Sequence, residues 1–330
     1  MPRSKSALAI VASLILVVFG FLSFDRGAQV PPADPGAGHV GIYLTSYALK
    51  NGGIMGGVLA AREAGKIDAL VINVKNMHGE VTYRTEIPFA REIGAAVDRI
   101  DLERIIPELR AQGFYLIARQ VAFYDPILAR RLGIKGSWVS PDDETVVSYN
   151  LAIANEVANL GFDEIQFDYI RYPDGGTLAP IYQERYAAIG RFLDSARRLL
   201  SSRVVLSADL FGRVLWGWNE KLIDPIGQSL EDVAEYVDFI SPMLYPSHYA
   251  EDHYKADPYR VVSEALASGM ARVEKPFRPF LQAFDLAIPA GMSLEDYIRA
   301  EIRAAQEMGA DGYLFWNPSC EYSALYRALD

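Results

Sequence analysis

Short β-rich runs and longer amphipathic segments alternate along the chain from residue 39 onward. Runs rich in β-branched and aromatic residues predict eight strands, at residues 40–47, 69–75, 114–123, 163–170, 204–212, 239–245, 278–286 and 312–318. Apolar residues at helical spacing predict helices at residues 101–113, 148–161, 181–200, 229–237, 257–269 and 293–309. Several of these segments have a Ser or Asp suited to N-capping and a Gly just past the end.

The alternation predicts the fold class. Eight strands, each followed by a helix, match an α/β protein of the (β/α)8 TIM-barrel type better than an open, doubly wound sheet. No glycine-rich dinucleotide fingerprint follows the first strand, which weakens the open-sheet alternative further. We therefore expect a single barrel domain over residues 39–330.

The N-terminal residues have a different pattern. Arg3 and Lys5 precede an uncharged apolar run from Ala7 to Phe24, which is near the lower limit for spanning a bilayer. The run fits an uncleaved transmembrane anchor, a cleaved signal peptide or a core helix, and we favour the anchor because no clear A-x-A cleavage site follows. We predict a signal anchor or signal peptide at residues 1–24 and a Pro/Gly/Ala-rich linker at residues 25–38.

This N-terminal pattern also predicts where the barrel resides. Positive charges that precede an apolar segment stay on the cytoplasmic side, so the domain that follows is exported. We expect the barrel in the periplasm or at the cell surface, either secreted or attached to the membrane through the N-terminal segment only.

Charge and residue usage narrow the function classes. The net charge is -10 and the pI is near 5.0, so nucleic acid is not an expected partner. A single cysteine, Cys320, excludes an internal disulfide and a cysteine metal cluster. His248 and His253 do not form an H-x-x-x-H or H-E-x-x-H motif, and G-x-S-x-G is absent. We therefore expect no metal, no other cofactor and no serine-hydrolase triad.

The active site of such a barrel gathers at the C-terminal ends of the strands and on the loops that follow. Polar and aromatic residues near the predicted strand ends are Lys75, Asn76, Arg119, Gln120, Asp168, Arg171, Asp209, Tyr245, His248, Gln282, Asp285, Trp316 and Asn317. These charges, amides and aromatic rings predict a binding or catalytic site at this end of the barrel.

The fourth predicted strand carries an unusual number of acids in a run that otherwise resembles a buried strand. Because side chains alternate along a strand, Glu164, Gln166 and Asp168 should face the barrel lumen. Asp168 is nearest the mouth, where a substrate can reach it, and we assign it a functional role. For Glu164 and Gln166 we favour a structural interpretation, with hydrogen bonds to Lys75 or Arg119.

The next strand offers a partner for Asp168. Ser207 and Asp209 share one face, and neighbouring strands lie about 4.8 Å apart, so the carboxyls of Asp168 and Asp209 should approach to roughly 5–8 Å. That range overlaps the separations in both retaining and inverting glycosidases. Close carboxylates also push each other's pKa values apart, which keeps one protonated as an acid. The alternative for Asp209 is a structural ion pair with Lys75 or Arg119.

Several long stretches resemble a known family. They are VINVKNMHGEV, IARQVAFYDP, YNLAIANEVANLGFDEIQFDYIRYP, LSADLFG, ISPMLYPSHY, FRPFLQAFDL and YLFWNPS. In this order, from Val40 to Asp330, the chain resembles a bacterial family of glycoside hydrolase-like proteins long known as a domain of unknown function. The resemblance implies a carbohydrate-active (β/α)8 barrel.

A fainter resemblance links the fourth strand to chitinase-type family 18 hydrolases. Asp163, Ile165, Asp168 and Pro173 sit near matching places. The position of the general-acid glutamate in that family is occupied by Ile170, which has no proton to donate, and Gln166 replaces an aspartate. The resemblance therefore implies either an acid from another strand, such as Asp209, or a barrel that only binds glycans.

Together these observations predict a glycoside hydrolase that acts on a cell-envelope or extracellular polysaccharide with Asp168 and Asp209 as its carboxylate pair. Lys75, Arg119 and Arg171 would orient the acids or hold sugar hydroxyls, although Arg171 could instead pair with Asp174. Stacking and polar contacts to the sugar are expected from Tyr245, His248, Gln282, Trp316 and Asn317, each of which is also compatible with a structural role. The alternatives are a non-catalytic glycan-binding barrel and, less favoured because the histidine motif is missing, a polysaccharide deacetylase or another metal-dependent hydrolase.

Overall fold

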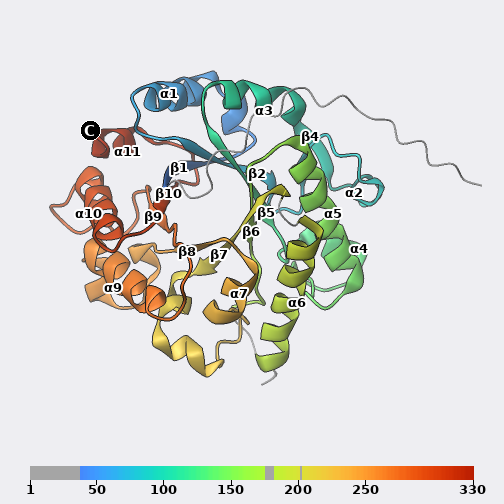
Figure 1. The fold of residues 1–330 in the computed structure, drawn as a ribbon. Coiled ribbons are helices and arrows are strands. Elements are labelled where there is room, and N and C mark those ends of the chain that lie inside the picture. Colours follow the sequence, from blue (N-terminus) through green and yellow to red (C-terminus); the bar gives the residue numbers. More distant parts are fainter. Residues whose placement is uncertain (1–37, 175–181, 201–202) are drawn as a thin grey trace, which may run out of the picture. The chain divides into compact units, whose positions relative to one another are not determined.

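Eight parallel strands close into a barrel in the computed structural model, which describes residues 38–174, 182–200 and 203–330 (Figure 1). In chain order they are β1 (His39–Leu44), β2 (Ala69–Lys75), β5 (Tyr115–Val121), β6 (Glu164–Asp168), β7 (Val205–Phe211), β8 (Phe239–Met243), β9 (Phe280–Gln282) and β10 (Gly312–Trp316). On β1, Ile42 lies opposite Leu70 of β2 and opposite Phe315 of β10, which closes the barrel. All eight predicted strands are confirmed.

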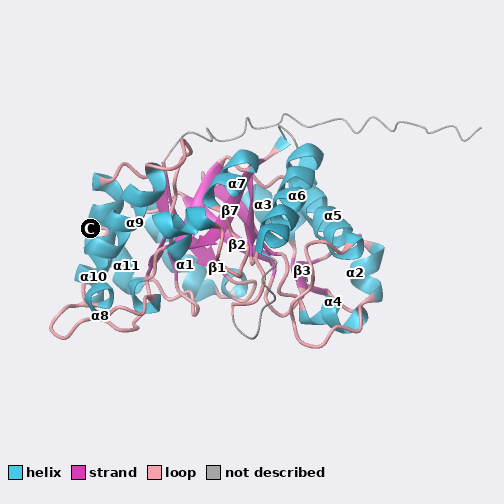
Figure 2. Cartoon of the chain, turned by 90° about the horizontal axis from the view of Figure 1, so that it is seen from below, coloured by secondary structure: helices cyan, strands magenta, loops and turns pink. Residues whose placement is uncertain are grey.

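Helices form the outer layer, with the strands inside (Figure 2). They are α1 (Gly52–Glu63), α3 (Leu102–Ala111), α5 (Glu144–Leu160), α6 (Tyr182–Leu200), α7 (Leu230–Tyr236), α9 (Pro258–Met270), α10 (Leu294–Glu307) and α11 (Ser323–Ala328). The six predicted helices are confirmed, and α1 and α11 are additional. The sequence of α1, GGIMGGVLAARE, has four glycines, which obscure the apolar periodicity that identifies a helix.

Smaller elements lie between the main strands and helices of the barrel. A short hairpin-like addition consists of β3 (Val81–Tyr83), antiparallel to β2, and β4 (Ala96–Ile100), parallel to β3. Short helices are α2 (Pro88–Glu92), α4 (Pro126–Arg131) and α8 (Asp252–Lys255), and 3-10 turns are η1 (Ala48–Lys50), η3 (Gly212–Leu215), η4 (Gly217–Lys221) and η5 (Pro246–His248). The turns η3, η4 and η5 follow β7 and β8 and therefore build one side of the barrel mouth.

The predicted N-terminal anchor or signal peptide and nearly all of the linker lie outside the described residues. Among the residues that the structure does describe, no helix is both long enough and apolar enough to cross a membrane.

The side chains of β6 alternate between the helix layer and the lumen, as predicted. Phe167 packs edge-on against Phe192 of α6, with ring centroids 5.2 Å apart, whereas Glu164 and Gln166 face inward. Their partners differ from the prediction. Glu164 forms a fully buried ion pair of 2.5 Å with Arg278 and accepts hydrogen bonds from the hydroxyls of Tyr115 and Ser207.

The two expected partners, Lys75 and Arg119, do not bind this inner layer. Gln166 instead donates to the hydroxyl of Ser241, 3.2 Å away. Arg119 binds Asp168 closer to the mouth, and Lys75 is directed out of the lumen. A lumenal side chain can bond to any strand of the closed barrel, so its partner depends on the relative height of the strands rather than on sequence order.

A second buried carboxyl lies outside the lumen, between α10 and the barrel. Glu301 is fully buried, accepts a hydrogen bond of 3.3 Å from the backbone N–H of Gln282 on Oε1, and has no partner for Oε2 within the described residues. Burial raises the pKa of Glu301 well above its usual value because the charged form is poorly solvated there. The folded protein therefore keeps this proton to a higher pH than the unfolded chain does.

This carboxyl makes stability depend on pH. Above about pH 4.5, the ordinary pKa of a glutamate, the unfolded chain is ionised at this position while the folded chain keeps the proton. Folding takes up a proton, so the free energy of unfolding falls as the pH rises from that value through the raised pKa. Glu301→Gln should remove this loss, which amounts to about 1.4 kcal/mol for each pKa unit of the shift.

Urea unfolding at about pH 5 and pH 8 measures the effect. The stability of Glu301→Gln relative to the unsubstituted protein should increase between the two pH values. Glu307→Gln, on the exposed part of the same helix, serves as the control and should follow the unsubstituted protein. A pH dependence that is the same in all three proteins would show that Glu301 is not the buried acid described here.

Candidate active site

Three charged side chains from neighbouring strands meet at the C-terminal mouth of the barrel. Arg119 lies near the end of β5, Asp168 ends β6 and Asp209 lies near the end of β7. The Nε atom of Arg119 is 2.9 Å from Oδ2 of Asp168 and 3.9 Å from Oδ2 of Asp209. These two carboxylate oxygens are therefore separated by no more than the sum of those distances, about 6.8 Å. The predicted approach of the two carboxyls is compatible with this geometry, and the guanidinium lies next to both.

Arg119 is held in place from several sides. Its Nη1 donates a hydrogen bond of 2.9 Å to Asn73 on β2, and its guanidinium lies over the rings of Trp316 and Tyr43, at 5.0 and 5.4 Å from their centroids. The two rings stack on each other, with centroids 3.9 Å apart. Because these contacts restrict the guanidinium, they also determine the position of the Asp168 carboxylate that it binds.

Asp168 is oriented by the backbone as well as by Arg119. Its Oδ1 accepts a hydrogen bond of 2.6 Å from the N–H of Tyr169, and its Oδ2 accepts from both Nε and Nη2 of Arg119. Tyr169 has a φ of 53°, a left-handed conformation that is strained for a residue with a large side chain. This conformation occurs directly after the end of β6, at the residue whose backbone N–H binds the Asp168 carboxylate.

Asp209 has a different environment from Asp168. Its side chain is buried, and its Oδ1 has no hydrogen-bond partner within the described part of the chain. Burial and the neighbouring Asp168 charge raise the pKa of Asp209 well above its usual value, although Arg119 opposes this shift. The two acids therefore have different environments: burial shifts Asp209 toward its neutral form, whereas Asp168 is held in an ion pair with Arg119.

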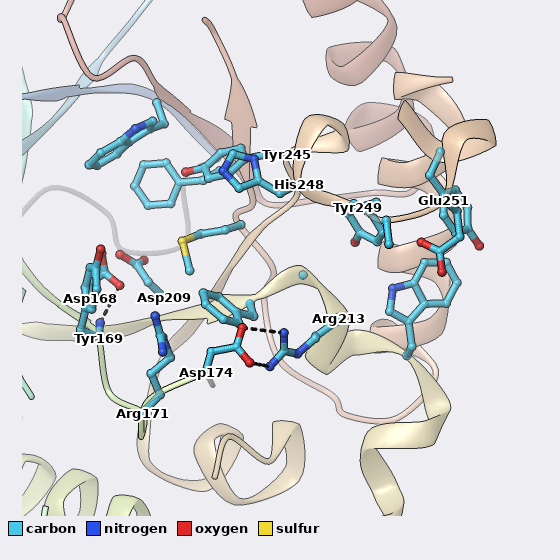
Figure 3. Close-up of a pocket in the computed structure, with 18 of the residues that line it drawn as sticks. Asp168, Tyr169, Arg171, Asp174, Asp209, Arg213, Tyr245, His248, Tyr249 and Glu251 are labelled. Atoms are coloured by element: carbon cyan, nitrogen blue, oxygen red, sulfur yellow. Dashed lines mark hydrogen bonds and ion pairs between the residues drawn. The ribbon is translucent and has the colours of Figure 1, made fainter. Parts of the chain in front are cut away.

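A cavity of about 810 Å³ opens beside the two acids (Figure 3). It is lined by Arg119, Asp168, Tyr169, Arg171, Asp174, Asp209, Phe211, Gly212, Arg213, Trp216, Trp218, Met243, Tyr245, His248, Tyr249, Ala250, Glu251, Tyr254, Phe280 and Trp316. Of the residues predicted from the sequence, Asp168, Asp209, Arg119, Arg171, Tyr245, His248 and Trp316 are brought together here. The volume is near the upper end of the range that is common for small-molecule sites.

The far end of the cavity was not predicted. Trp216 and Trp218 come from the loop after β7, and Tyr249, Glu251 and Tyr254 come from the loop and short helix after β8. Figure 3 shows Tyr249 and Glu251 on the opposite side of the cavity from Asp168. The sequence did hold a signal for this part, because two tryptophans stand two residues apart in the segment that follows a barrel strand.

The aromatic residues Tyr245 and His248 form one wall of the cavity. Their ring centroids are 5.4 Å apart, and Phe284 packs edge-on against Tyr245 at 5.7 Å. Burial lowers the pKa of His248, so its imidazole is neutral near pH 7. This wall offers mainly apolar surface to a ligand.

Lys75 does not line the cavity. Its side chain is fully buried between strand and helix, where its ammonium lies 2.8 Å from Asp125 and donates to the carbonyl of Val121. The pairing of β2 with β5 shifts register between Asn73 and Lys75, which breaks the alternation of side chains. Asn73 consequently faces the lumen, and Lys75 does not. The prediction of Lys75 at the site is therefore corrected.

Gln282 and Asn317 are also absent from the cavity wall. The amide nitrogen of Gln282 donates to the carbonyls of Phe284 and Leu286, and that of Asn317 donates to the carbonyls of Ala283 and Glu321. Both side chains thus stabilise the loops that follow β9 and β10. The two side-chain amides that were predicted to bind a sugar therefore donate to backbone carbonyls of these loops instead.

The chemistry available here is that of a carboxyl pair. Within the described ranges, no group of three or more His, Cys, Asp or Glu side chains is arranged to hold a metal ion. Of two neighbouring carboxyls in a cavity with aromatic walls, one can donate a proton to an atom of a ligand while the other attacks or activates water nearby.

Comparison with known proteins gives a consistent picture. The model of a family described as "Putative glycosyl hydrolase domain" matches residues 41–322. No curated protein matches the chain. The glycoside hydrolase domain of PgaB (BpsB) from Bordetella bronchiseptica has 13% identity and a TM-score of 0.63, over 88% of this chain and 97% of that chain.

Two further solved structures share the architecture. The spore cortex-lytic enzyme SleL of Bacillus cereus has 14% identity and a TM-score of 0.58, over 89% of this chain and 74% of that chain. The endo-1,4-beta-D-mannanase of Thermotoga petrophila RKU-1 has 15% identity and a TM-score of 0.55, over 84% of this chain and 87% of that chain. At these identities the likenesses establish the barrel fold.

Proposed function

The chain belongs to the family whose model matches residues 41–322, and we propose that it cleaves a glycosidic bond in a cell-envelope or extracellular polysaccharide with Asp168 and Asp209. The observation that carries the proposal is the unequal environment of the two carboxyls. Asp209 is buried and one of its oxygens has no hydrogen-bond partner among the described residues, whereas Asp168 is held by Arg119. Hydrolysis of a glycoside needs two such carboxyls in unlike environments, one to donate a proton and one to act as nucleophile or base.

The two acids would take different roles. Protonated Asp209 would donate its proton to the glycosidic oxygen as the bond to the anomeric carbon breaks. As that bond breaks, Asp168 would either attack the anomeric carbon, giving a glycosyl-enzyme that water hydrolyses with Asp209 as the base, or remove a proton from a water that attacks the anomeric carbon. The upper limit of about 6.8 Å between their Oδ2 atoms leaves room for both outcomes, because retaining pairs are about 5–5.5 Å apart and inverting pairs about 6.5–9.5 Å.

The aromatic residues of the mouth would bind the sugar chain. Trp316 and Tyr245 border the acid pair, and Trp216 and Trp218 lie toward the other end of the cavity. Ring faces of this kind present apolar surface to the C–H faces of a sugar. Aromatic residues at both ends support a polymeric substrate that extends beyond the cleaved bond.

The location of the enzyme is part of the proposal. We infer from the apolar run at residues 7–24 that the protein is exported and stays attached to the membrane or is secreted. Cell fractionation of the full chain and of a chain without residues 1–24 tests this. The truncated form should remain in the cytoplasm, and an exported truncated form would contradict the inference.

A panel of envelope and extracellular polysaccharides, incubated with the full-length protein, tests the activity. Release of new reducing ends supports the proposal, and the anomeric form of the first product, followed by NMR, distinguishes retention from inversion. Binding without cleavage would favour the glycan-binding alternative. The buried Ile170 is the residue consistent with that alternative, because it leaves the cavity without the acid that chitinase-type barrels carry there.

A further inference from the structure

Arg171, at the cavity, has no counter-ion among the residues that the structure describes. Arg171 follows Asp168 by three residues and lines the same cavity, yet it forms no ion pair with any residue in the ranges 38–174, 182–200 and 203–330. Its one hydrogen bond to the described protein goes from Nη1 to the carbonyl of Tyr172, at 3.0 Å. A guanidinium has five N–H donors, so most of the donors of Arg171 are available to a ligand.

The neighbouring acids are already engaged. Asp174, the partner that the sequence suggested for Arg171, instead binds Arg213 through both of its oxygens, at 2.8 and 3.0 Å. Arg213 also pairs with Asp224 at 3.0 Å, and Asp168 is taken by Arg119. Residues 175–181, which follow in the chain and lie outside the described part, contain no Asp or Glu. Of the three arginines here, Arg119 and Arg213 pair with carboxylates, and Arg171 pairs with none of the described ones.

Aromatic rings hold the Arg171 guanidinium in place. Its central carbon lies 4.5 Å from the ring centroid of Trp138, 4.4 Å from that of Phe211 and 5.4 Å from that of Tyr169. Rings packed against a guanidinium face leave its edge, which carries the N–H groups, as the part that meets a ligand. Figure 3 shows this side chain directed into the space that Asp168 and Asp209 border.

We propose that Arg171 binds the carboxylate of a uronic acid in the substrate, at a sugar next to the cleaved bond, so that the polysaccharide is an anionic one. The inference rests on the proposed function because it places the uronic acid next to the cleaved bond. Binding of the carboxylate can nevertheless be measured without catalysis. The edge of a guanidinium can donate two parallel hydrogen bonds to the two oxygens of a carboxylate. A single sugar hydroxyl has one oxygen and cannot accept this pair of bonds in the same way. Burial lowers the pKa of Arg171, and a bound carboxylate offsets that desolvation.

Pairs of oligosaccharides that differ only at the carboxylate test the proposal. Trisaccharides of galacturonate, mannuronate and glucuronate are compared with their carboxyl-reduced, neutral counterparts, by calorimetric titration into the full-length protein. At least one acidic trisaccharide should bind roughly 10- to 100-fold more tightly than its reduced form, as expected for a charge-assisted hydrogen bond. In Arg171→Gln this ratio should fall toward one, and Arg171→Lys should keep part of it.

Arg104→Gln provides the matched control. It removes the same charge from α3, where Arg104 is exposed and paired with Glu108, and it should keep the full preference for the acidic trisaccharide. Thermal unfolding establishes that each variant is folded. Equal binding of acidic and reduced forms by the unsubstituted protein, or an unchanged preference in folded Arg171→Gln, would overturn the inference.

Activity assays distinguish a failure of this inference from a failure of the proposed function. If the protein prefers an acidic trisaccharide but cleaves neither an acidic polysaccharide nor its reduced form, the enzyme assignment fails and the anion site stands. If it cleaves neutral polysaccharides in preference to acidic ones, the enzyme assignment stands and the anion site fails.

Discussion

Asp209→Asn is expected to lower kcat for polysaccharide hydrolysis by about 10²- to 10⁴-fold, the usual contribution of a general acid. The amide cannot donate the proton that the leaving oxygen needs. The side chain is nearly the same in size, so the fold and the cavity should be retained. Asp194→Asn on the outer helix α6, where the carboxylate pairs with Arg198 at the surface, is the matched control and should keep full activity.

The pH profile and the leaving group identify the role of Asp209. In the unsubstituted protein, activity should fall as the pH rises through the raised pKa of Asp209, because the acid then loses the proton that it must donate. That alkaline limb should be absent in Asp209→Asn. An aryl glycoside whose phenolate leaves without protonation should be much less affected by the substitution than the polysaccharide.

Asp168→Asn distinguishes the two acids. This variant should lose activity on the aryl glycoside and on the polysaccharide alike, because the attack on the anomeric carbon is impaired with either leaving group. If instead Asp168→Asn spares the aryl glycoside and Asp209→Asn does not, the two roles are reversed. If hydrolysis survives both substitutions, the pair is not the catalytic pair.

Arg278→Met should destabilise the fold by about 3–5 kcal/mol, the typical cost of removing one partner of a buried ion pair. Arg278 and Glu164 are both fully buried in the lumen and lie 2.5 Å apart. Without the guanidinium, the carboxylate retains the hydroxyls of Ser207 and Tyr115 but has no compensating charge. Urea unfolding measures the loss.

The double variant separates the charge from the packing. Glu164→Gln combined with Arg278→Met removes both charges, and it should recover at least half of the stability lost in Arg278→Met, because a buried pair replaced as a whole costs little. Arg104→Met, which breaks an exposed pair with Glu108, should cost less than about 1 kcal/mol. A double variant as unstable as the sum of its two single variants would mean that Glu164 and Arg278 do not interact.

The strand pattern alone was sufficient to predict the barrel. Runs such as ALVINVK and VVLSADLFG are β-rich and bounded by turn residues, and their spacing with intervening helical patterns identifies a parallel, helix-covered sheet. The pattern fails where local composition hides it, as in the glycine-rich α1. It also places Asp168 and Asp209 at the mouth, because strand direction and alternation follow from the sequence.

The amino-acid pattern is therefore enough to predict the architecture and which acids face the cavity. The partners of the side chains became known from the folded barrel: the register shift that turns Lys75 away from the lumen, the loop carbonyls that bind Gln282 and Asn317, and the pairing of Asp174 with Arg213 rather than with Arg171. The difference lies in the range of the interactions. Alternation is set by the local backbone, whereas burial and charge pairing depend on strands and loops that lie far apart in the chain and meet only when the barrel closes.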